Sequence, residues 1–377
     1  MKRAPVPGAG RAPDRGRQGR AAPAALVSRV DLARGALLRG LTRLPATVQR
    51  ALSGMPPVRL DGLELHHESQ LMIALAARVG GPPIESLSPA EAREETVRRA
   101  LAVRGPQPAL SRVETLEIPG RCGPIGARLY APDPEPGGTG LLVYLHGGGW
   151  VIGNLETCES ICRFLVRESG AAVLAVDYRL APEHRFPAAV EDAVAALAYA
   201  AERAQYLGAD PARIAVGGDS AGANLATVAA QAARAGDAPQ PVFQLLIYPV
   251  CDLSEKRRSY HLFSEGFLLT EAEMDWFRDH YLPEPGARRD PRVSPLLAGD
   301  LSGLAPAYIA TAGFDPLRDE GEEYARRLSQ AGVVVALRRH EGLLHGYANL
   351  TAVGRGSREA MLEAAAALRM GLARRAA

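Results

Sequence analysis

The sequence predicts an α/β protein in which helices cover both faces of a mostly parallel sheet. Six short apolar runs, each suited to one buried strand, alternate with helical stretches along most of the 377-residue chain. They cover residues 141–145, 172–176, 213–216, 243–248, 307–311 and 333–337. Two further strand-like runs, 113–118 and 127–130, are joined by a Gly/Pro turn and predict an antiparallel hairpin before them.

The N-terminal part of the chain is basic and partly helical in pattern. The first fifty residues carry eleven Lys and Arg residues against two acidic ones, although the net charge of the whole chain is only +2. Residues 1–33 are rich in Arg, Pro and Gly and have little apolar surface to bury, so we expect a disordered tail. From Arg34 to Leu52, apolar residues recur every three or four positions, which predicts an amphipathic helix interrupted by Pro45.

Two interpretations of this basic amphipathic segment stay open. Its apolar stripe packs on the rest of the protein, or it makes weak contact with an anionic membrane surface. The next helix is marked more clearly, because Ser88, Pro89 and Glu91 have the spacing of an N-cap, a first-turn proline and a capping-box glutamate. This helix is predicted to run towards Val103.

Composition and cysteine usage exclude several classes of function. With 47% hydrophobic and 23% charged residues the chain is globular, and its small net charge gives no sign of nucleic-acid binding. The four cysteines form no CxxC motif or Cys/His cluster, and no phosphate-binding or dinucleotide fingerprint occurs, so we expect neither a metal nor a cofactor. We find no signal peptide and no membrane span, and we expect a cytoplasmic protein.

A strand, a sharp turn and a helix are predicted around Ser220. The run 213–216 leads into Gly217-Gly218-Asp219-Ser220-Ala221-Gly222, and an Ala-rich helical run follows. A Gly-x-Ser-x-Gly at such a junction is typical of a nucleophile elbow, where a strained turn exposes the serine hydroxyl above the sheet. Ser220 is therefore the candidate nucleophile, and we expect Asp219 to brace the turn.

A glycine-rich loop follows the strand-like run 141–145. Its sequence is His146-Gly147-Gly148-Gly149-Trp150. Acyl transfer builds negative charge on a carbonyl oxygen, and backbone N–H groups stabilise that charge best where no side chain prevents close approach. The loop is therefore a candidate oxyanion hole.

The candidate acid and base lie farther along the chain. Asp315 follows the run 307–311, and His345 comes after the run 333–337. Serine hydrolases with a nucleophile elbow have the order Ser, acid, His, and both residues are expected at the rim of the sheet where open α/β sheets bind ligands. Asp319 is the rival acid, but we expect it to begin the next helix, where its carboxylate faces the positive end of the dipole.

Residues 251–281 form the longest loop-like insertion. Its apolar residues Phe263, Phe267, Leu268 and Leu269 precede a helix that is capped by Thr270. We expect the insertion to contribute to a lid over the substrate.

Together these motifs resemble the hormone-sensitive-lipase-like family of α/β hydrolases, also described as bacterial family IV esterases with a G-D-x-G signature. Ala223 and Leu344 depart from common family residues. The matching stretches, in family order, are 146–150, 177–184, 218–222, 315–319 and 345–346.

The resemblance implies the α/β-hydrolase fold, with an eight-stranded, mostly parallel sheet and an N-terminal helical cap. The cap would comprise residues 34–110, and the catalytic domain would comprise residues 111–377, with a cap-contributing insertion near 251–281. A homodimer through the edge of the last strand is a further family expectation.

The resemblance also implies a role for each candidate site residue. Ser220 would be the nucleophile, His345 the general base and Asp315 its orienting acid. The oxyanion hole would consist of the backbone N–H groups of Gly147, Gly148 and Ala221. Such an enzyme hydrolyses short- to medium-chain acyl esters, so a small-molecule ester is the expected partner.

Other functions stay open on the same residues. An amidase, a carbamate hydrolase or a lactonase uses the same triad. The family also includes a non-catalytic small-molecule receptor, which has lost its histidine, whereas all three triad positions are filled here.

Overall fold

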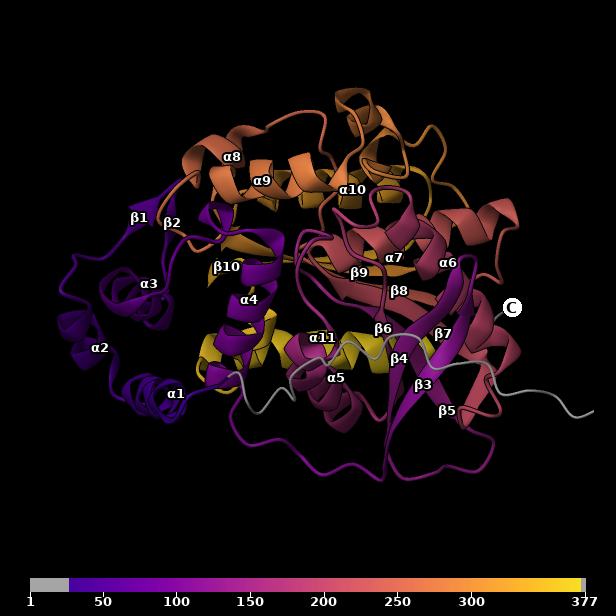
Figure 1. Cartoon of the computed structure of the whole chain (residues 1–377), viewed down its shortest axis with the longest axis horizontal. Helices are drawn as coiled ribbons and strands as arrows, with labels where there is room; N and C mark the ends of the chain where they lie inside the picture. The colour runs from indigo at the N-terminus through magenta and orange to yellow at the C-terminus, as the bar shows by residue number, and fades with distance from the viewer. Residues whose placement is uncertain (1–26, 374–377) are drawn as a thin grey trace, which may run out of the picture.

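The structure is a computed structural model that describes residues 27–373. The strands of its main sheet are β3 (Arg112–Gly120), β4 (Gly123–Ala131), β5 (Thr139–Leu145), β6 (Ala172–Asp177), β7 (Ala209–Asp219), β8 (Phe243–Ile247), β9 (Ala307–Phe314) and β10 (Val335–Leu344). They lie in the order β10-β9-β8-β7-β5-β6-β4-β3 (Figure 1). Among the described strands of this sheet, the antiparallel pairs are those of β4 with β3 and with β6. The predicted α/β-hydrolase fold with an eight-stranded, mostly parallel sheet is confirmed.

Helices cover both faces of the sheet, as predicted. Alternate side chains of β5 enter two separate cores: Leu141 and Val143 pack in one, and Leu142 and Tyr144 in the other. Figure 1 shows α7 and α10 above the sheet and α5 and α11 below it. The covering helices are α5 (Leu155–Ser169), α6 (Ala188–Glu202), α7 (Ala221–Ala235), α10 (Arg318–Gln330) and α11 (Arg355–Ala373).

The N-terminal helices lie beside the sheet. They comprise α1 (Arg29–Leu41), α2 (Ala46–Ser53), α3 (His67–Val79) and α4 (Pro89–Val103), with a short hairpin of β1 (Arg59–Leu60) and β2 (Leu63–Glu64) and a 3-10 turn, η2 (Ile84–Ser86). The helix predicted from its capping box is α4, in which Ser88 and Glu91 form the reciprocal bonds. Figure 1 shows α1, α2 and α3 at the left margin, and the start of α3 is hydrogen-bonded to β10. The boundaries predicted for the cap and the catalytic domain stay predictions.

The first helix begins earlier than the sequence analysis placed it. Helix α1 starts at Arg29 and not at Arg34, because Ser28 caps it and forms a capping box with Asp31. Residues 29–33, which we assigned to a disordered tail, are thus helical, while residues 1–26 of that tail lie outside the described part of the chain. Helix α1 ends at Leu41, before Pro45, and α2 begins directly after Pro45.

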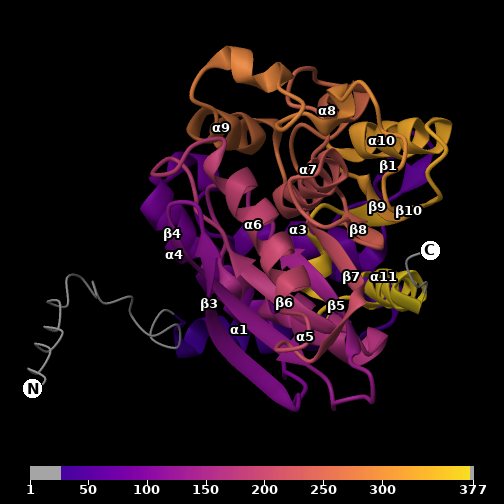
Figure 2. The same cartoon turned by 90° about the vertical axis from the view of Figure 1, so that its right-hand side faces the viewer.

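The insertion after β8 carries two helices, α8 (Arg258–Leu262) and α9 (Glu271–Tyr281). Thr270 caps α9, as predicted. Figure 2 shows both helices at the top of the molecule. The apolar side chain of Phe263 is buried against Phe314 and Leu65, so the insertion joins the N-terminal hairpin to the end of β9. Two 3-10 turns follow, η3 (Pro285–Arg289) and η4 (Pro295–Leu297).

The last strand is longer than its apolar run. Strand β10 continues to Leu344, with a register shift against β9 between His340 and Leu344. The extension carries Arg338, Arg339 and Glu341, and such charges are common on an edge strand, so a search for apolar runs missed it. His345 therefore follows the strand directly, and the 3-10 turn η5 (Tyr347–Leu350) comes next.

No helix within residues 27–373 is long and apolar enough to span a membrane.

Candidate active site

Ser220 occupies a strained turn between β7 and α7. Its backbone has φ 55° and ψ −120°, and its N–H donates to the carbonyl oxygen of Ile247 at 2.9 Å. A Cβ atom at Gly218 or Gly222 would lie 2.2 Å or 1.9 Å from the carbonyl oxygen of Leu145. Only glycine fits at these two positions, because the backbone of Leu145 lies too close for a side chain. This is the steric requirement of the predicted nucleophile elbow.

The structure brings the three predicted triad residues together. His345 Nε2 lies 3.0 Å from Ser220 Oγ, and His345 Nδ1 lies 2.7 Å from Asp315 Oδ2. The other oxygen of Asp315, Oδ1, accepts the N–H of Leu317 at 2.8 Å. Because an ionised carboxylate only accepts, the proton of a neutral His345 resides on Nδ1, and Nε2 is left to accept from the serine.

An aromatic side chain packs against the His345 ring. Tyr248 lies against the imidazole with a centroid distance of 4.5 Å, and Tyr347 packs edge-on against Tyr248. Tyr248 has φ 38°, and its N–H donates to Ala310 at 2.6 Å. The sequence analysis did not identify Tyr248, whose only local signal was its place at the end of an apolar run.

The glycine loop is fixed by the residue before the serine. The buried Asp219 accepts the Tyr144 hydroxyl at 2.6 Å and the N–H of Gly147 at 2.9 Å through the same oxygen, Oδ1. Burial raises the pKa of the Asp219 carboxyl, while these two donors lower it. Asp219 thus braces the loop against the elbow.

The bond to Asp219 bears on one sequence assignment, which stays a prediction. We expected the N–H of Gly147 to face an oxyanion, but in this structure it is directed to a carboxylate. The N–H groups of Gly148, Gly149 and Ala221 have no hydrogen bond to any residue between 27 and 373. The loop reverses at Gly148, with φ 121°, and Gly149, with φ 56°, so successive N–H groups point in different directions.

Gly149 is also where the insertion meets the loop. A Cβ atom at this glycine would lie 2.1 Å from the ring of Phe277 on α9. The next residue, Trp150, stacks on Tyr281 of the same helix with a centroid distance of 4.3 Å. Helix α9 therefore packs directly on the candidate oxyanion loop.

Comparison with known proteins identifies the fold family. A family model described as alpha/beta hydrolase fold matches residues 142–349, more than half of the chain. The chain belongs to this α/β hydrolase family. The hydrolase is 47% identical over 339 residues to the carboxylic ester hydrolase LipN of Mycobacterium tuberculosis, covering 88% of this chain and 89% of that protein. It is 39% identical to an ethyl acetate hydrolase of Pseudomonas putida, covering 75% of this chain and 91% of that one.

Solved structures agree with these sequence matches. An ester hydrolase from the metagenome of Lake Arreo, in complex with a bipyridine phosphonate derivative, superposes with a TM-score of 0.78 at 41% identity, covering 82% of this chain and all of that one. A thermostable esterase from Pseudomonas putida has the same TM-score at 37% identity, covering 85% and 99%. The predicted membership of the hormone-sensitive-lipase-like esterases is confirmed.

The acid loop of this hydrolase is tied to the N-terminal hairpin. Arg318 is buried, and its guanidinium donates to Gly313, Asp319 and Asp61, the last at 2.8 Å. Asp61 lies in the β1–β2 turn and also pairs with Arg258 at 2.6 Å. The rival acid Asp319 therefore belongs to this ion-pair group, as a first-turn residue of α10, and not to the triad.

Helix α4 is tied to the oxyanion loop in a similar way. Arg93 donates to the carbonyl oxygens of Val151 and Ala181 and forms a two-pronged ion pair with Glu183. Val151 directly follows the predicted oxyanion motif. One arginine thus joins an N-terminal helix to two loops at the rim.

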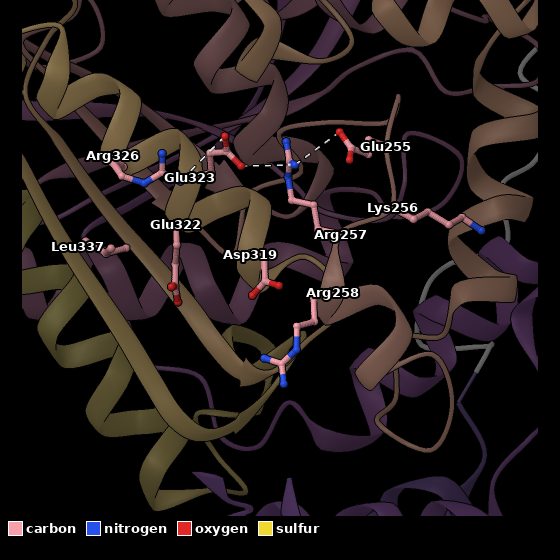
Figure 3. A pocket seen from close by; sticks show the side chains of 9 residues that line it. All are labelled: Glu255, Lys256, Arg257, Arg258, Asp319, Glu322, Glu323, Arg326 and Leu337. Atoms are coloured by element: carbon pink, nitrogen blue, oxygen red, sulfur yellow. Dashed lines mark ion pairs between the residues drawn. The ribbon is translucent and has the colours of Figure 1, made fainter. Parts of the chain in front are cut away.

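Figure 3 shows the side chains that line a charged hollow of about 680 Å³. None of its lining residues is Ser220, Asp315 or His345, and Arg257 at its wall pairs with Glu323 and Glu255. The residues that line it are Glu255, Lys256, Arg257, Arg258, Asp319, Glu322, Glu323, Arg326 and Leu337. An acyl chain requires apolar walls, so this hollow is not the acyl site.

One group of side chains within residues 27–373 has the composition of a metal site. His66, His67 and Glu68, at the start of α3, have potential ligand atoms within 4.8 Å of one another. Glu68 accepts the N–H of Gly356 at 3.1 Å, and the group contains no triad residue. The expectation that the enzyme uses no metal or cofactor stays a prediction.

Proposed function

We propose that this hydrolase is a serine carboxylesterase that cleaves short- to medium-chain acyl esters through Ser220, His345 and Asp315. The observation that supports it most is the continuous chain from Ser220 Oγ to His345 and on to Asp315, with contacts of 3.0 and 2.7 Å. These three side chains lie at the strained turn of Ser220, next to the glycine loop, whose Gly148 and Gly149 N–H groups have no acceptor within residues 27–373. The site thus contains a nucleophile, a base, an orienting acid and oxyanion donors, as acyl transfer requires.

The reaction follows from this geometry. His345 Nε2 takes the proton of Ser220 as the hydroxyl oxygen attacks the ester carbonyl, and Asp315 stabilises the imidazolium that forms. The protonated His345 then donates to the leaving alcohol, which leaves an acyl-enzyme. Water attacks the acyl-enzyme with His345 again as base, and the carboxylic acid is released.

For the oxyanion hole we propose Gly148, Gly149 and Ala221, and we assign Gly147 a positioning role. The support is the different use of the N–H groups: within residues 27–373, that of Gly147 is bonded to Asp219, and those of Gly148, Gly149 and Ala221 have no acceptor. Each donor to the oxyanion is worth about 3 kcal/mol of the activation barrier in comparable enzymes. Loss of one donor would therefore lower kcat by roughly two orders of magnitude.

The preference for shorter acyl chains is supported by two observations. Phe277 and Tyr281 of α9 pack on the oxyanion loop, which places aromatic side chains near the reacting carbonyl. The Pseudomonas putida relative is named an ethyl acetate hydrolase, after an ester with two short chains. Long acyl chains would have to bypass the packed insertion.

The test is a series of p-nitrophenyl esters, from acetate to dodecanoate, on the wild type and on Ser220→Ala. We expect turnover that is highest between butanoate and octanoate and falls by about 10⁴-fold or more in the variant. Full activity in Ser220→Ala would overturn the catalytic assignment. Faster turnover of matched anilides, carbamates or lactones than of esters would favour the amidase, carbamate hydrolase or lactonase alternative.

We also propose that α1 and α2 make weak contact with an anionic membrane surface. Leu37 is 61% exposed, and arginines at 29, 34, 39 and 43 lie among the apolar residues. The exposed large apolar residues of this segment are Val30, Leu32, Leu37, Leu44, Val48, Leu52 and Met55. Co-sedimentation with phosphatidylglycerol vesicles should fall in Leu37→Ser but not in Met370→Ser, whose side chain is exposed on α11. Equal binding to neutral phosphatidylcholine vesicles would contradict the electrostatic part.

A homodimer through β10 and a cytoplasmic location complete the proposal. Strand β10 is an outer strand of the sheet, and Leu337 on it is 45% exposed. All four cysteines are free, as a reducing compartment requires. Sedimentation velocity that finds only the 40.0 kDa chain at micromolar concentration would remove the dimer.

A further inference from the structure

One face of α9 is directed towards the active site. Glu273, Phe277 and Tyr281 are spaced four residues apart, so their side chains lie on the same side of the helix. Phe277 contacts the position of a Cβ at Gly149, and Tyr281 stacks on Trp150. Glu273 is one turn nearer the N-terminus of α9 and continues this face beyond the oxyanion loop.

Glu273 occupies a capping-box position without forming a capping box. Its N–H donates to Thr270 Oγ1 at 3.1 Å, but its carboxylate does not return to the backbone N–H of Thr270. In α4 the equivalent Glu91 makes both reciprocal bonds. The carboxyl group of Glu273 has no hydrogen bond or ion pair with any residue between 27 and 373.

The other acids at the start of α9 are paired. Glu271 and Asp275 both bind Lys256, and Asp275 also binds Arg278. Glu273 lies between them in sequence, on the opposite side of the helix, and the charges of Glu85, Arg99 and His345 act on its carboxyl group. Burial, with Glu85 adding to it, raises the pKa of Glu273 to about 7, while His345 and Arg99 oppose the rise.

A part-exposed carboxyl group without a partner among residues 27–373, on the helix face that packs on the candidate oxyanion loop, is suited to bind a substrate group. A cation or a hydrogen-bond donor on the ester would supply the missing partner, and a carboxylate on the ester would be repelled. The interaction is strong only if water is displaced when the substrate binds beneath α9.

We propose that Glu273 determines substrate specificity, favouring esters that carry a positive charge over neutral esters of the same shape and disfavouring esters that carry a carboxylate. This inference rests on the proposed esterase function. It adds a substrate class that the triad alone does not specify. Glu273 is not a catalytic residue, since it acts on the part of the substrate away from the scissile bond.

The test uses two butanoate esters of equal shape and different charge. One is the ester of 2-(trimethylammonio)ethanol, and the other is its neutral isostere, the ester of 3,3-dimethylbutanol. We expect the wild type to have a kcat/KM about tenfold higher for the cationic ester at pH 8, and this ratio to fall close to one in Glu273→Gln. Glu271→Gln is the matched control, because it removes a charge from the same helical turn on the paired face.

The ratio of kcat/KM for the cationic ester to that for the neutral ester, measured as a function of pH, distinguishes the effect of Glu273 from that of His345. A change at the catalytic histidine affects the hydrolysis of both esters equally and cancels in the ratio. The ratio should rise between pH 6 and pH 8 as Glu273 loses its proton, and Glu273→Gln should abolish that rise. A half-ester of succinic acid should show the opposite trend, with turnover that improves in the variant.

Three results would overturn the proposal: a ratio near one in the wild type, an unchanged ratio in Glu273→Gln, or an equal fall in Glu271→Gln. Failure of the esterase function itself would look different, because the neutral ester would not be hydrolysed. Calorimetric binding of both esters to Ser220→Ala then still tests Glu273, since it requires no turnover. Equal Kd values for the two esters in that background would contradict it.

Discussion

The two halves of the active site are held by different forces. Ser220 and the glycine loop follow β7 and β5 at the centre of the sheet, where close backbone contacts and the buried Asp219 fix them. Asp315 and His345 follow β9 and β10 at one side of the sheet. There the support comes from ion pairs and from segments distant in sequence, since Arg318 binds Asp61 across 257 residues.

The difference shows which half depends on the N-terminal region. At the centre, close backbone contacts and the buried Asp219 together leave one arrangement. At the side, the carbonyl oxygen of Gly342 accepts the N–H of His66 and the hydroxyl of Ser69, so the last strand relies on the start of α3. We therefore expect changes to the residues that support the central half to lower activity more than changes to the residues that support the side.

Gly149→Ala should have the largest effect. The added methyl group would lie 2.1 Å from the Phe277 ring, and φ 56° is unfavourable for alanine. We expect kcat for p-nitrophenyl butanoate to fall by more than about 100-fold, as on loss of an oxyanion donor. Gly286→Ala is the control, because nothing lies within 4 Å of its Cβ position and its φ is not positive. Retained kcat in Gly149→Ala would show that the loop is adaptable.

Asp219→Ala should come second. It releases the N–H of Gly147 and leaves the buried Tyr144 hydroxyl without its acceptor. We expect kcat to fall by about 30-fold with little change in KM, because the oxyanion donors lose their position. Tyr144→Phe keeps the bond to Gly147 and should cost much less. Equal losses of kcat in the two variants would mean that the packing around Tyr144, and not the bond between Gly147 and Asp219, positions the loop.

Asp61→Asn tests the side of the sheet and should have a smaller effect. It removes the charge that pairs with the buried Arg318 and with Arg258. We expect kcat/KM to fall about threefold and the free energy of unfolding to fall by about 1–2 kcal/mol. Asp300→Asn, which breaks a pair between Arg234 and an exposed carboxylate, should change neither. An inactive Asp61→Asn would show that activity depends on the supports at the side of the sheet as strongly as on those at the centre.

The smallest effect is a pH dependence of stability. The hydrogen bond from Arg258, together with Arg318, lowers the pKa of Asp61 below its ordinary 3.8. A lowered folded-state pKa stabilises the fold above the ordinary value and ceases to do so as the pH falls through the lowered one. The Tm difference between wild type and Asp61→Asn should thus be constant from pH 7 to about pH 5 and shrink below about pH 4. Thermal scans in which the difference grows on acidification would contradict this sign.

The same contrast explains what the sequence could predict. The central half consists of contiguous motifs, so Ser220 and the glycine loop could be recognised from neighbours alone. The choice of oxyanion donors could not, because it depends on the backbone angles at Gly148 and Gly149, which turn the N–H of Gly147 towards Asp219. A motif names the residues of a loop but not the direction of each amide.

At the side of the sheet, the triad residues were predicted but their supports were not. Asp315 and His345 follow from chain order and a post-strand position. Asp61 has no local signal, since an aspartate in a short turn is common, and its partner Arg318 lies far along the chain. The early start of α1 did have a signal, the pair Ser28 and Asp31 at capping-box spacing, which the apolar repeat concealed.

The contact between Phe277 and Gly149 has a consequence for recombining this enzyme with its relatives. Helix α9 and the glycine loop are separated by more than a hundred residues, yet a ring on one occupies the space that a methyl group would need on the other. Chimeras that exchange the insertion alone would pair a foreign helix with this loop. Crossover points should therefore be chosen so that residues 146–150 and 251–281 come from the same parent. The chimera then receives the substrate range of that parent together with a working oxyanion hole.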